Sequence, residues 1–188
     1  MNTELFQLKS SEAIAPDINL AASGMVMLEG TQLTIAFLLS GDLEKVAIAP
    51  SKSKAGIGAA RGDRLWEQTC FEFFLAAGPK PTTNTPYWEF NLSPSGDWNI
   101  FALDGYRRGL KEEDAISYLS FGVENKPESV CLDLRDVDIS RLVSLNQPLW
   151  LGVSAVIVLK TGVQTFWAIA HPRPEPDFHH PDSFVLAL

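Results

Sequence analysis

Residues 87–93, YWEFNLS, place a row of polar groups on one side of an extended chain. Successive side chains of a β-strand point to opposite faces, so the Trp, Phe and Leu of this stretch would share one face and the polar residues the other. The polar face then carries Tyr87, Glu89, Asn91 and Ser93. These side chains can donate and accept hydrogen bonds to a polar ligand, although an ordinary solvated sheet face can also be polar.

A second stretch, RLWEQTCFEFFLAA at 64–77, shows the same alternation. Its apolar residues between 71 and 75 suit the core, and the opposite face carries Trp66, Gln68 and Glu72. If this strand pairs with 87–93, the two polar faces combine into one. The short turn SPSGD then leads into a third strand and places Trp98 near the rim of that face.

The combined face has the chemistry of a carbohydrate site. Aromatic rings pack on the apolar face of a sugar, and Glu, Gln and Asn pair with its hydroxyl groups. Two carboxylates on adjacent strands also repel each other, so Glu72 and Glu89 require a ligand, a proton or a basic partner. Arg107 and Arg108, in DGYRRG after the third strand, are candidate partners.

The elements that must position these residues are predicted to be strands. Residues 24–42 form a hairpin that turns at Gly30, and Asp104–Ala115 and Val137–Leu145 are the places with some helical character. The other predicted strands are Val46–Ala49, Leu65–Ala76, Tyr87–Ser93, Trp98–Leu103, Ser117–Val123, Ser129–Leu134, Leu149–Leu159, Val163–Ala170 and Phe184–Leu188. This pattern predicts an all-β fold, an antiparallel β-sandwich of jelly-roll type with little helix, formed by residues 1–188 as a single domain.

Composition narrows the partners. The 188 residues carry a net charge of −8, which disfavours nucleic acid and an anionic membrane surface. The start of the chain lacks the basic and apolar regions of a signal peptide, so we expect a cytoplasmic protein with Cys70 and Cys131 as free thiols. The glycine-rich loop at 55–63 lacks the Lys-Ser/Thr pair of a phosphate-binding loop.

All three histidines lie in the segment His171–Asp182, HPRPEPDFHHPD. Its proline residues spread the side chains apart, so the interpretation we favour is that His and Asp anchor an extended segment through hydrogen bonds to its backbone. Binding of a metal by these His, Asp and Glu residues is the alternative. We predict no metal and no cofactor.

Three motifs in order, LWEQTCFEFFLA, YWEFNLSPSGDWNIFALDGYR and HP…PDFHHPDSFVL, resemble the DOMON-like proteins of bacteria, which are related to the family-nine carbohydrate-binding modules. The resemblance implies a β-sandwich that binds a ligand without turning it over. In those modules two tryptophans hold a terminal sugar, and a Glu follows the first Trp by six residues, as Glu72 follows Trp66 here. The second Trp follows an Asn by three residues, for which Gln164 and Trp167 are the nearest counterparts. Arg107 could correspond to an Arg that reaches the sugar.

The sequence therefore predicts non-catalytic binding of a carbohydrate or a similar polar small molecule. Two alternatives stay open. One is a glycoside hydrolase in which Glu72 and Glu89 form the carboxylate pair. The other is a module that binds a protein through an exposed sheet edge or apolar patch.

Overall fold

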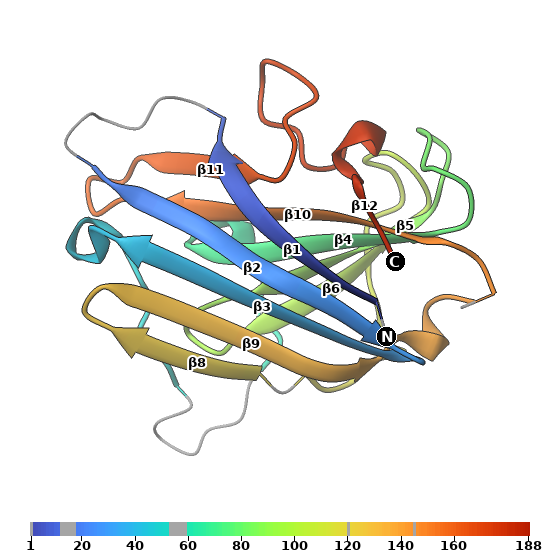
Figure 1. Ribbon diagram of the computed structural model, residues 1–188, viewed down its shortest axis with the longest axis horizontal. Helices are drawn as coiled ribbons and strands as arrows, with labels where there is room; N and C mark the ends of the chain where they lie inside the picture. Colours follow the sequence, from blue (N-terminus) through green and yellow to red (C-terminus); the bar gives the residue numbers. More distant parts are fainter. Residues whose placement is uncertain (1, 12–17, 53–59, 120, 145) are drawn as a thin grey trace.

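The computed structural model describes residues 2–11, 18–52, 60–119, 121–144 and 146–188, and in these the strands form two packed layers (Figure 1). The first layer consists of β1 (Asn2–Ser10), β2 (Leu20–Glu29), β3 (Gln32–Gly41), β9 (Ser129–Asp138) and β8 (Phe121–Lys126). The second consists of β4 (Cys70–Ala77), β5 (Tyr87–Leu92), β6 (Trp98–Leu103), β7 (Lys111–Glu112), β10 (Leu149–Val158), β11 (Gln164–Ala168) and β12 (Leu186–Ala187). All these strand pairs are antiparallel, which confirms the predicted all-β sandwich.

The strands form one continuous path through both layers, in the order β7-β6-β5-β4-β10-β11-β1-β2-β3-β9-β8. Strand β1 joins the layers because its first residues pair with β2, whereas Lys9 and Ser10 pair with β11. The short β12 pairs with the start of β10, where β11 does not reach. Strand β1 therefore connects the two layers, and β12 attaches the C-terminal residues to the second layer.

The core lies between the two layers and is built from the alternate apolar residues of each strand. Phe37 of the first layer packs on Phe71 of the second with ring centroids 5.1 Å apart. Phe73 and Phe90, neighbours on β4 and β5, stack at 4.2 Å. Because these rings point inward, the residues between them in sequence, including Glu72 and Glu89, must point to the outer face of the second layer.

Several predicted strands are confirmed with small shifts at their ends. The first hairpin turns at Gly30, which has φ +59°, a backbone conformation that favours glycine. Residues 98–103 match the prediction without a shift. The predicted hairpin of Ser117–Val123 and Ser129–Leu134 is instead formed by β8 and β9, which begin or end up to four residues later.

Other predictions were wrong. Val46–Ala49 forms an isolated bridge from Val46 to Leu159 and not a strand. The predicted strand Leu65–Ala76 begins only at Cys70, and before it lies a 3-10 helix, η3 (Leu65–Glu67). The two regions expected to have some helical character are confirmed in part, since the first contains turns beside β7 and the second contains the 3-10 helix η4 (Ile139–Arg141). Strand β1 was not predicted, although its Phe6 and Leu8 alternate as a strand requires.

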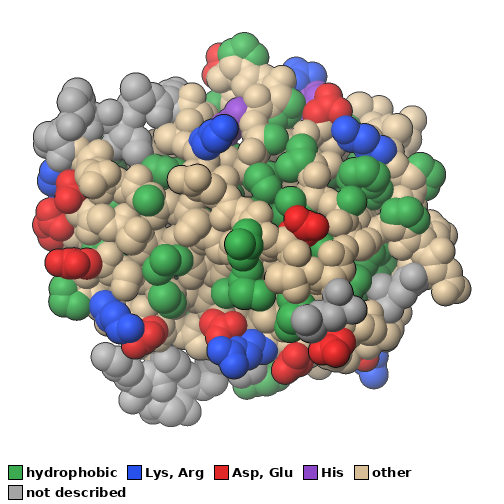
Figure 2. All heavy atoms as spheres, viewed as in Figure 1, with side chains coloured by type: hydrophobic (Ala, Val, Ile, Leu, Met, Phe, Trp, Pro, Cys, Tyr) green, Lys and Arg blue, Asp and Glu red, His purple; other side chains and the backbone are tan. Residues whose placement is uncertain are grey.

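Other 3-10 helices are η1 (Leu43–Lys45) and η5 (Pro181–Ser183), the latter in the segment that crosses the second layer near the C-terminus. None of the helices in the described ranges is long and apolar enough to cross a membrane. Figure 2 shows the outer face of the first layer, where hydrophobic side chains are scattered among polar and charged ones. Leu5 on β1 and Leu38 on β3 are exposed. The buried polar residues gather instead on the second layer.

Candidate functional site

Two buried carboxylates form the floor of the candidate site, on the outer face of the second layer. The side chains of Glu72 on β4 and Glu89 on β5 are 3% and 5% exposed. In the β4–β5 register Glu72 lies across from Asn91, and Glu89 lies across from Phe74. The two carboxylates are therefore diagonal neighbours, as the alternation of the two strands predicted.

Each carboxylate has incomplete hydrogen bonding. The side-chain amide of Asn91 donates to Oε1 of Glu89 over 2.9 Å, and the hydroxyl of Ser154 on β10 donates to Oε2 of Glu72 over 3.2 Å. Oε1 of Glu72 is buried and has no hydrogen-bond partner among the described residues. A buried acceptor without a donor costs free energy. This oxygen therefore has the environment of an atom that is completed by a ligand.

The surroundings favour the neutral form of both acids. Burial raises the pKa of Glu72 well above its usual range, and the nearby charge of Glu89 raises it further. Burial also raises the pKa of Glu89, against the opposing effects of Asn91 and Arg107. Beside them, the buried thiol of Cys70 has a raised pKa, first from burial and then from the charge of Glu72. The floor thus holds protons more readily than an exposed sheet face would.

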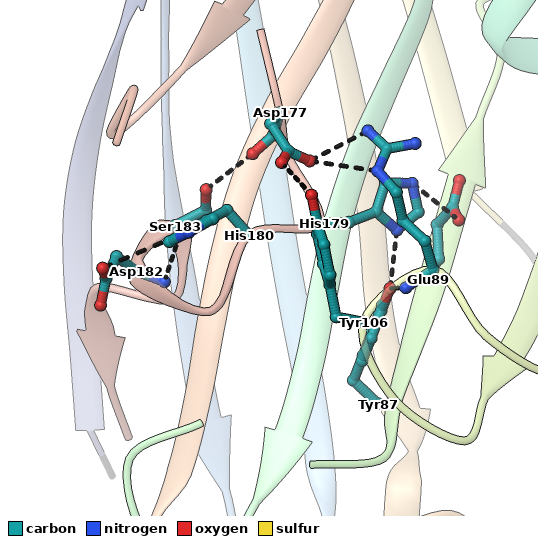
Figure 3. Close-up of polar contacts among 9 residues, drawn as sticks. Tyr87, Glu89, Tyr106, Asp177, His179, His180, Asp182 and Ser183 are labelled. Atoms are coloured by element: carbon teal, nitrogen blue, oxygen red, sulfur yellow. Dashed lines mark hydrogen bonds and ion pairs between the residues drawn. The ribbon is translucent and has the colours of Figure 1, made fainter. Parts of the chain in front are cut away.

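Residues 171–184, which we call the roof segment, cross the outer face of the second layer. Asp177 is its anchor (Figure 3): it accepts hydrogen bonds from the Tyr106 hydroxyl over 2.6 Å and from Nη2 of Arg107 over 2.9 Å. Burial pushes the pKa of Asp177 upward, but these two hydrogen bonds outweigh burial and hold the pKa below its ordinary value. The Ser183 hydroxyl donates to the backbone carbonyl of Asp177 over 3.1 Å, which secures the following turn.

His179 is the second anchor of the roof segment. Its Nδ1 lies 2.8 Å from the Tyr87 hydroxyl, and its Nε2 lies 3.9 Å from Oε2 of Glu89 (Figure 3). Burial, with the charge of Arg107, lowers the pKa of His179 to about 4, so the imidazole is neutral at pH 7. Burial raises the pKa of Tyr87 to about 12. These groups therefore form a neutral hydrogen-bonded link between roof and floor.

Apolar packing completes the attachment of the roof segment. Phe184 meets Phe74 and Tyr87 edge to face, with centroids 6.2 and 5.5 Å apart. Gly152 on β10 allows this approach, since a Cβ atom there would lie 3.1 Å from the carbonyl oxygen of Ser183. The outer face is consequently buried over part of its area, which explains why its polar residues are inaccessible.

A pocket of about 630 Å³ remains between the floor, η3 and the roof segment. Its lining residues are Trp66, Glu67, Glu72, Glu89, Leu103, Arg107, Leu110, Val156, Gln164, Phe166, Pro176, Phe178 and His179. Trp66 is held edge-on against Phe101 at 5.7 Å, and Phe166 packs against Phe178 at 6.2 Å. Aromatic walls above two buried acids are a combination suited to a small ligand with both apolar and polar surface.

The structure brings together five of the residues that sequence predicted for the site. Trp66, Glu72, Glu89, Arg107 and Gln164 all line the pocket. Trp66 reaches it from a 3-10 helix, and not from the strand that carries Glu72. Arg107 and Arg108, the candidate basic partners of the floor carboxylates, instead contact Asp177 and Asn84.

The other predicted residues lie elsewhere. Tyr87 and Asn91 are buried beside the pocket and act through His179 and Glu89. The hydroxyl of Ser93 accepts hydrogen bonds from Ser95 within the turn. Gln68 is exposed outside the pocket lining because the 3-10 helix at 65–67 interrupts the alternation of a strand before it.

The other two tryptophans that were predicted for the site belong to the core. Trp98, predicted near the rim, is 1% exposed and lies under the guanidinium group of Arg61 at 4.5 Å. Trp167, predicted as a counterpart of the second sugar-holding Trp, is 4% exposed and packs in the core between the layers. The physical reason is the strand period: β11 directs Gln164 and Phe166 to the pocket, so Trp167 points the opposite way.

Sequence reasoning missed the roof contribution and the wall at Phe166. Phe166 could have been found from the alternation of β11, but the position of His179 over the floor depends on a contact with Tyr87, 92 residues away in sequence. The predicted anchoring role of the His171–Asp182 segment is observed in detail: His171 contacts the backbone carbonyl of Lys9 at 2.8 Å, and His180 accepts from the backbone of Asp182. In the described ranges no three His, Cys, Asp or Glu residues are grouped to hold a metal ion.

Comparison with known proteins gives similarity in structure alone. No protein-family model and no curated protein sequence matches the chain. A protein from Bacteroides uniformis to which carbohydrate binding has been assigned shares 12% identity and a TM-score of 0.65, over 95% of this chain and 84% of that one.

Two structures of family-nine carbohydrate-binding modules from Caldicellulosiruptor kristjanssonii are also similar. The one in complex with glucose has a TM-score of 0.55 and 8% identity over 96% of this chain and 82% of that chain. The one in complex with cellotriose has a TM-score of 0.51 and 10% identity over 89% of this chain and 72% of that chain. The chain therefore has the β-sandwich fold found in family-nine carbohydrate-binding modules.

Proposed function

We propose that this protein binds a carbohydrate, without turning it over, in the pocket between the floor carboxylates and the roof segment. One observation carries the proposal: Oε1 of Glu72 is buried at the pocket and has no partner among the described residues. A hydroxyl group of a sugar would supply the missing donor. The aromatic rings of Trp66 and Phe166 line the same space and can pack on the apolar face of the sugar ring.

Size and fold support the same ligand class. A volume of about 630 Å³ lies within the usual range of small-molecule pockets, roughly 300–1,000 Å³. The similar modules from C. kristjanssonii were solved with glucose and cellotriose, so these two sugars are sensible first ligands. Shared fold alone does not determine function, and the proposal therefore depends on the pocket.

Glycoside hydrolysis is the competing function, because the pocket contains a pair of carboxylates. A retaining or inverting pair needs one carboxyl group ionised and the other protonated. Here burial raises the pKa of both Glu72 and Glu89. A raised pKa in both groups disfavours the ionised carboxylate that such a pair needs as its nucleophile or base.

Isothermal titration calorimetry with glucose, cellotriose and a panel of other saccharides tests the proposal. We expect binding to the wild type and a loss of about tenfold or more in Trp66→Ala, since the ring is a wall of the pocket. Tyr118→Ala is the matched control, because Tyr118 is an exposed aromatic residue outside the pocket. Failure of the folded protein to bind any saccharide would overturn the proposal, and turnover of aryl glycosides that Glu72→Gln abolishes would establish the hydrolase instead.

A further inference from the structure

The charges around the pocket are unbalanced. Among the described residues its lining contains the acidic side chains of Glu67, Glu72 and Glu89 and, besides His179, the basic side chain of Arg107. Arg107 is already paired with Asp177 over 2.9 Å, and Arg64 lies 3.4 Å from Glu67 at the rim. The two floor carboxylates are left without a direct cationic partner in the described residues.

The net charge around the floor depends on the side chains of every element packed against it. The strands β10 and β11 supply Ser154, Val156, Gln164 and Phe166, none of which is charged. The titratable groups that face the floor are Cys70, Glu72, Tyr87, Glu89, Glu67, Arg107, Asp177 and His179. His179, the group nearest to Glu89 from the roof segment, is neutral at pH 7 because its pKa is lowered to about 4. In the described residues the cation that acts on Glu89 is Arg107, and Arg107 is already paired with Asp177.

The walls of the pocket suit a cation as well as a sugar ring. Trp66, Phe166 and Phe178 line the space above the carboxylates. The faces of aromatic rings attract ammonium groups. A cation held between these rings and a carboxylate would gain a charge-assisted hydrogen bond, which is roughly twice as strong as a neutral one.

We infer that the pocket is built for a carbohydrate that bears a protonated amino group, an amino sugar, whose ammonium group donates to Oε1 of Glu72 and lies beside Glu89. This inference rests on the proposed function and narrows its ligand class. The unpartnered oxygen of Glu72 is the atom that argues for it, because an ammonium group offers up to three donors at one point. A neutral sugar would satisfy that oxygen but would bring no positive charge to stabilise the ionised form of either acid.

Binding of an ammonium group would also move a proton. In the empty pocket burial favours the protonated form of Glu72. When the ammonium group binds, the O–H bond of Glu72 breaks and its proton passes to the buffer, while an N–H of the ligand donates to the carboxylate that remains. The atoms and the charge balance, since one cation enters as one proton leaves. A neutral sugar gives no such release.

Calorimetry with glucosamine, glucose and N-acetylglucosamine tests this inference, at a pH where the amine is protonated. The three ligands share a ring, and only glucosamine carries a charge. We expect glucosamine to bind about tenfold or more tightly than the other two. Repeating the titration in buffers with different ionisation enthalpies should show protons released with glucosamine only.

Variants connect the preference to the floor. Glu72→Gln, which keeps the shape of the side chain, should reduce the ratio of glucosamine to glucose affinity and abolish proton release, and Glu89→Gln should reduce the ratio independently. Gln68→Ala is the control, because Gln68 is exposed outside the pocket lining. Equal or tighter binding of glucose by the wild type, or an unchanged ratio in both floor variants, would overturn the inference while leaving carbohydrate binding intact. Binding of cyclohexylamine without any saccharide would support the cation site and overturn the carbohydrate proposal.

Discussion

The hydroxyl group of Tyr87 lies 2.8 Å from Nδ1 of His179, and this contact joins strand β5 to a segment 92 residues later in the chain. The backbone N–H of Arg107 donates to the same hydroxyl oxygen over 3.3 Å. The phenol has one O–H donor, and the arrangement that uses it has Tyr87 donating to Nδ1, which leaves the proton of His179 on Nε2, facing Glu89. A single phenol therefore sets the orientation of the residue that closes the pocket over its floor.

Removing this hydroxyl should loosen the roof segment. In Tyr87→Phe the ring packing is kept, but Nδ1 of His179 loses its donor, so we expect the free energy of unfolding to fall by about 1–3 kcal/mol. Denaturation in urea measures the change. Tyr118→Phe removes an exposed hydroxyl and should lie within about 0.5 kcal/mol of the wild type. Equal stability of the Tyr87 and Tyr118 variants would contradict the assigned hydrogen bond.

Acid should destabilise the protein through His179. Its pKa is about 4 in the folded state and 6.5 in a model peptide. The unfolded chain therefore binds the extra proton first, and stability is lost as the pH falls from 6.5 to 4, by about 3 kcal/mol in total. His179→Gln cannot take up this proton, so its unfolding free energy should vary less across that window. Parallel pH profiles for the two proteins would refute the prediction.

Glu72 should act in the opposite direction. Burial raises its pKa above the ordinary value of 4.5, so the folded protein keeps this proton to higher pH than the unfolded chain does. Above pH 4.5 Glu72 therefore lowers the free energy of unfolding, and this loss of stability grows with pH until the folded group ionises. We expect Glu72→Gln to melt a few degrees higher than the wild type in alkaline buffer, where about 1 kcal/mol corresponds to 2–4 °C. Glu124→Gln controls for loss of one negative charge at an exposed position.

Asp177 should hold the roof segment in place. Asp177→Asn weakens the hydrogen bonds from Tyr106 and Arg107, so hydrogen exchange of the backbone amides of His180 and Ser183 should become faster. Mass spectrometry of peptides from the segment measures this exchange. Asp182→Asn is the control, since that carboxylate is 66% exposed. If both variants exchange alike, Asp177 is not the anchor that the geometry indicates.

Adjacent aromatic residues on β11 should separate ligand binding from stability. Phe166→Ala removes a wall of the pocket and should weaken saccharide binding by about tenfold with a small change in melting temperature. Trp167→Ala empties part of the core and should cost about 3–5 kcal/mol of unfolding free energy. Calorimetry and urea denaturation of the two variants measure both effects. Loss of saccharide binding in Trp167→Ala and not in Phe166→Ala would instead support the predicted site role of Gln164 and Trp167.

The floor of the site could be predicted from sequence because it depends on local periodicity. Strands β4 and β5 are neighbours in sequence and joined by one loop, so the alternation of Glu72 and Glu89 with phenylalanines was enough to place both acids on one face. The prediction that Gln164 and Trp167 both line the site was wrong because it ignored this alternation. Residues three apart on a strand lie on opposite faces, and a pattern matched by spacing alone ignores that constraint.

The roof could not be predicted in the same way. The segment from 171 to 184 contains only the short helix η5, and its position depends on side-chain contacts of Asp177 and His179 with distant residues. No periodicity encodes such contacts. The early start predicted for β4 failed because residues 65–67 turn as a 3-10 helix, where the alternation of a strand does not apply. Both errors arise where tertiary contacts outweigh local pattern.

The path of strands ends in edge strands, and these affect whether the molecules aggregate at high concentration. An unpaired strand edge is a template on which a second chain can add and begin a fibril. In the described part of the chain the path ends at β7, only two residues long, and at β8, where Glu124 and Lys126 are exposed and paired with each other over 3.1 Å. A short edge and a charged edge both oppose such growth, so the two ends of this path are unfavourable places for a second chain to add.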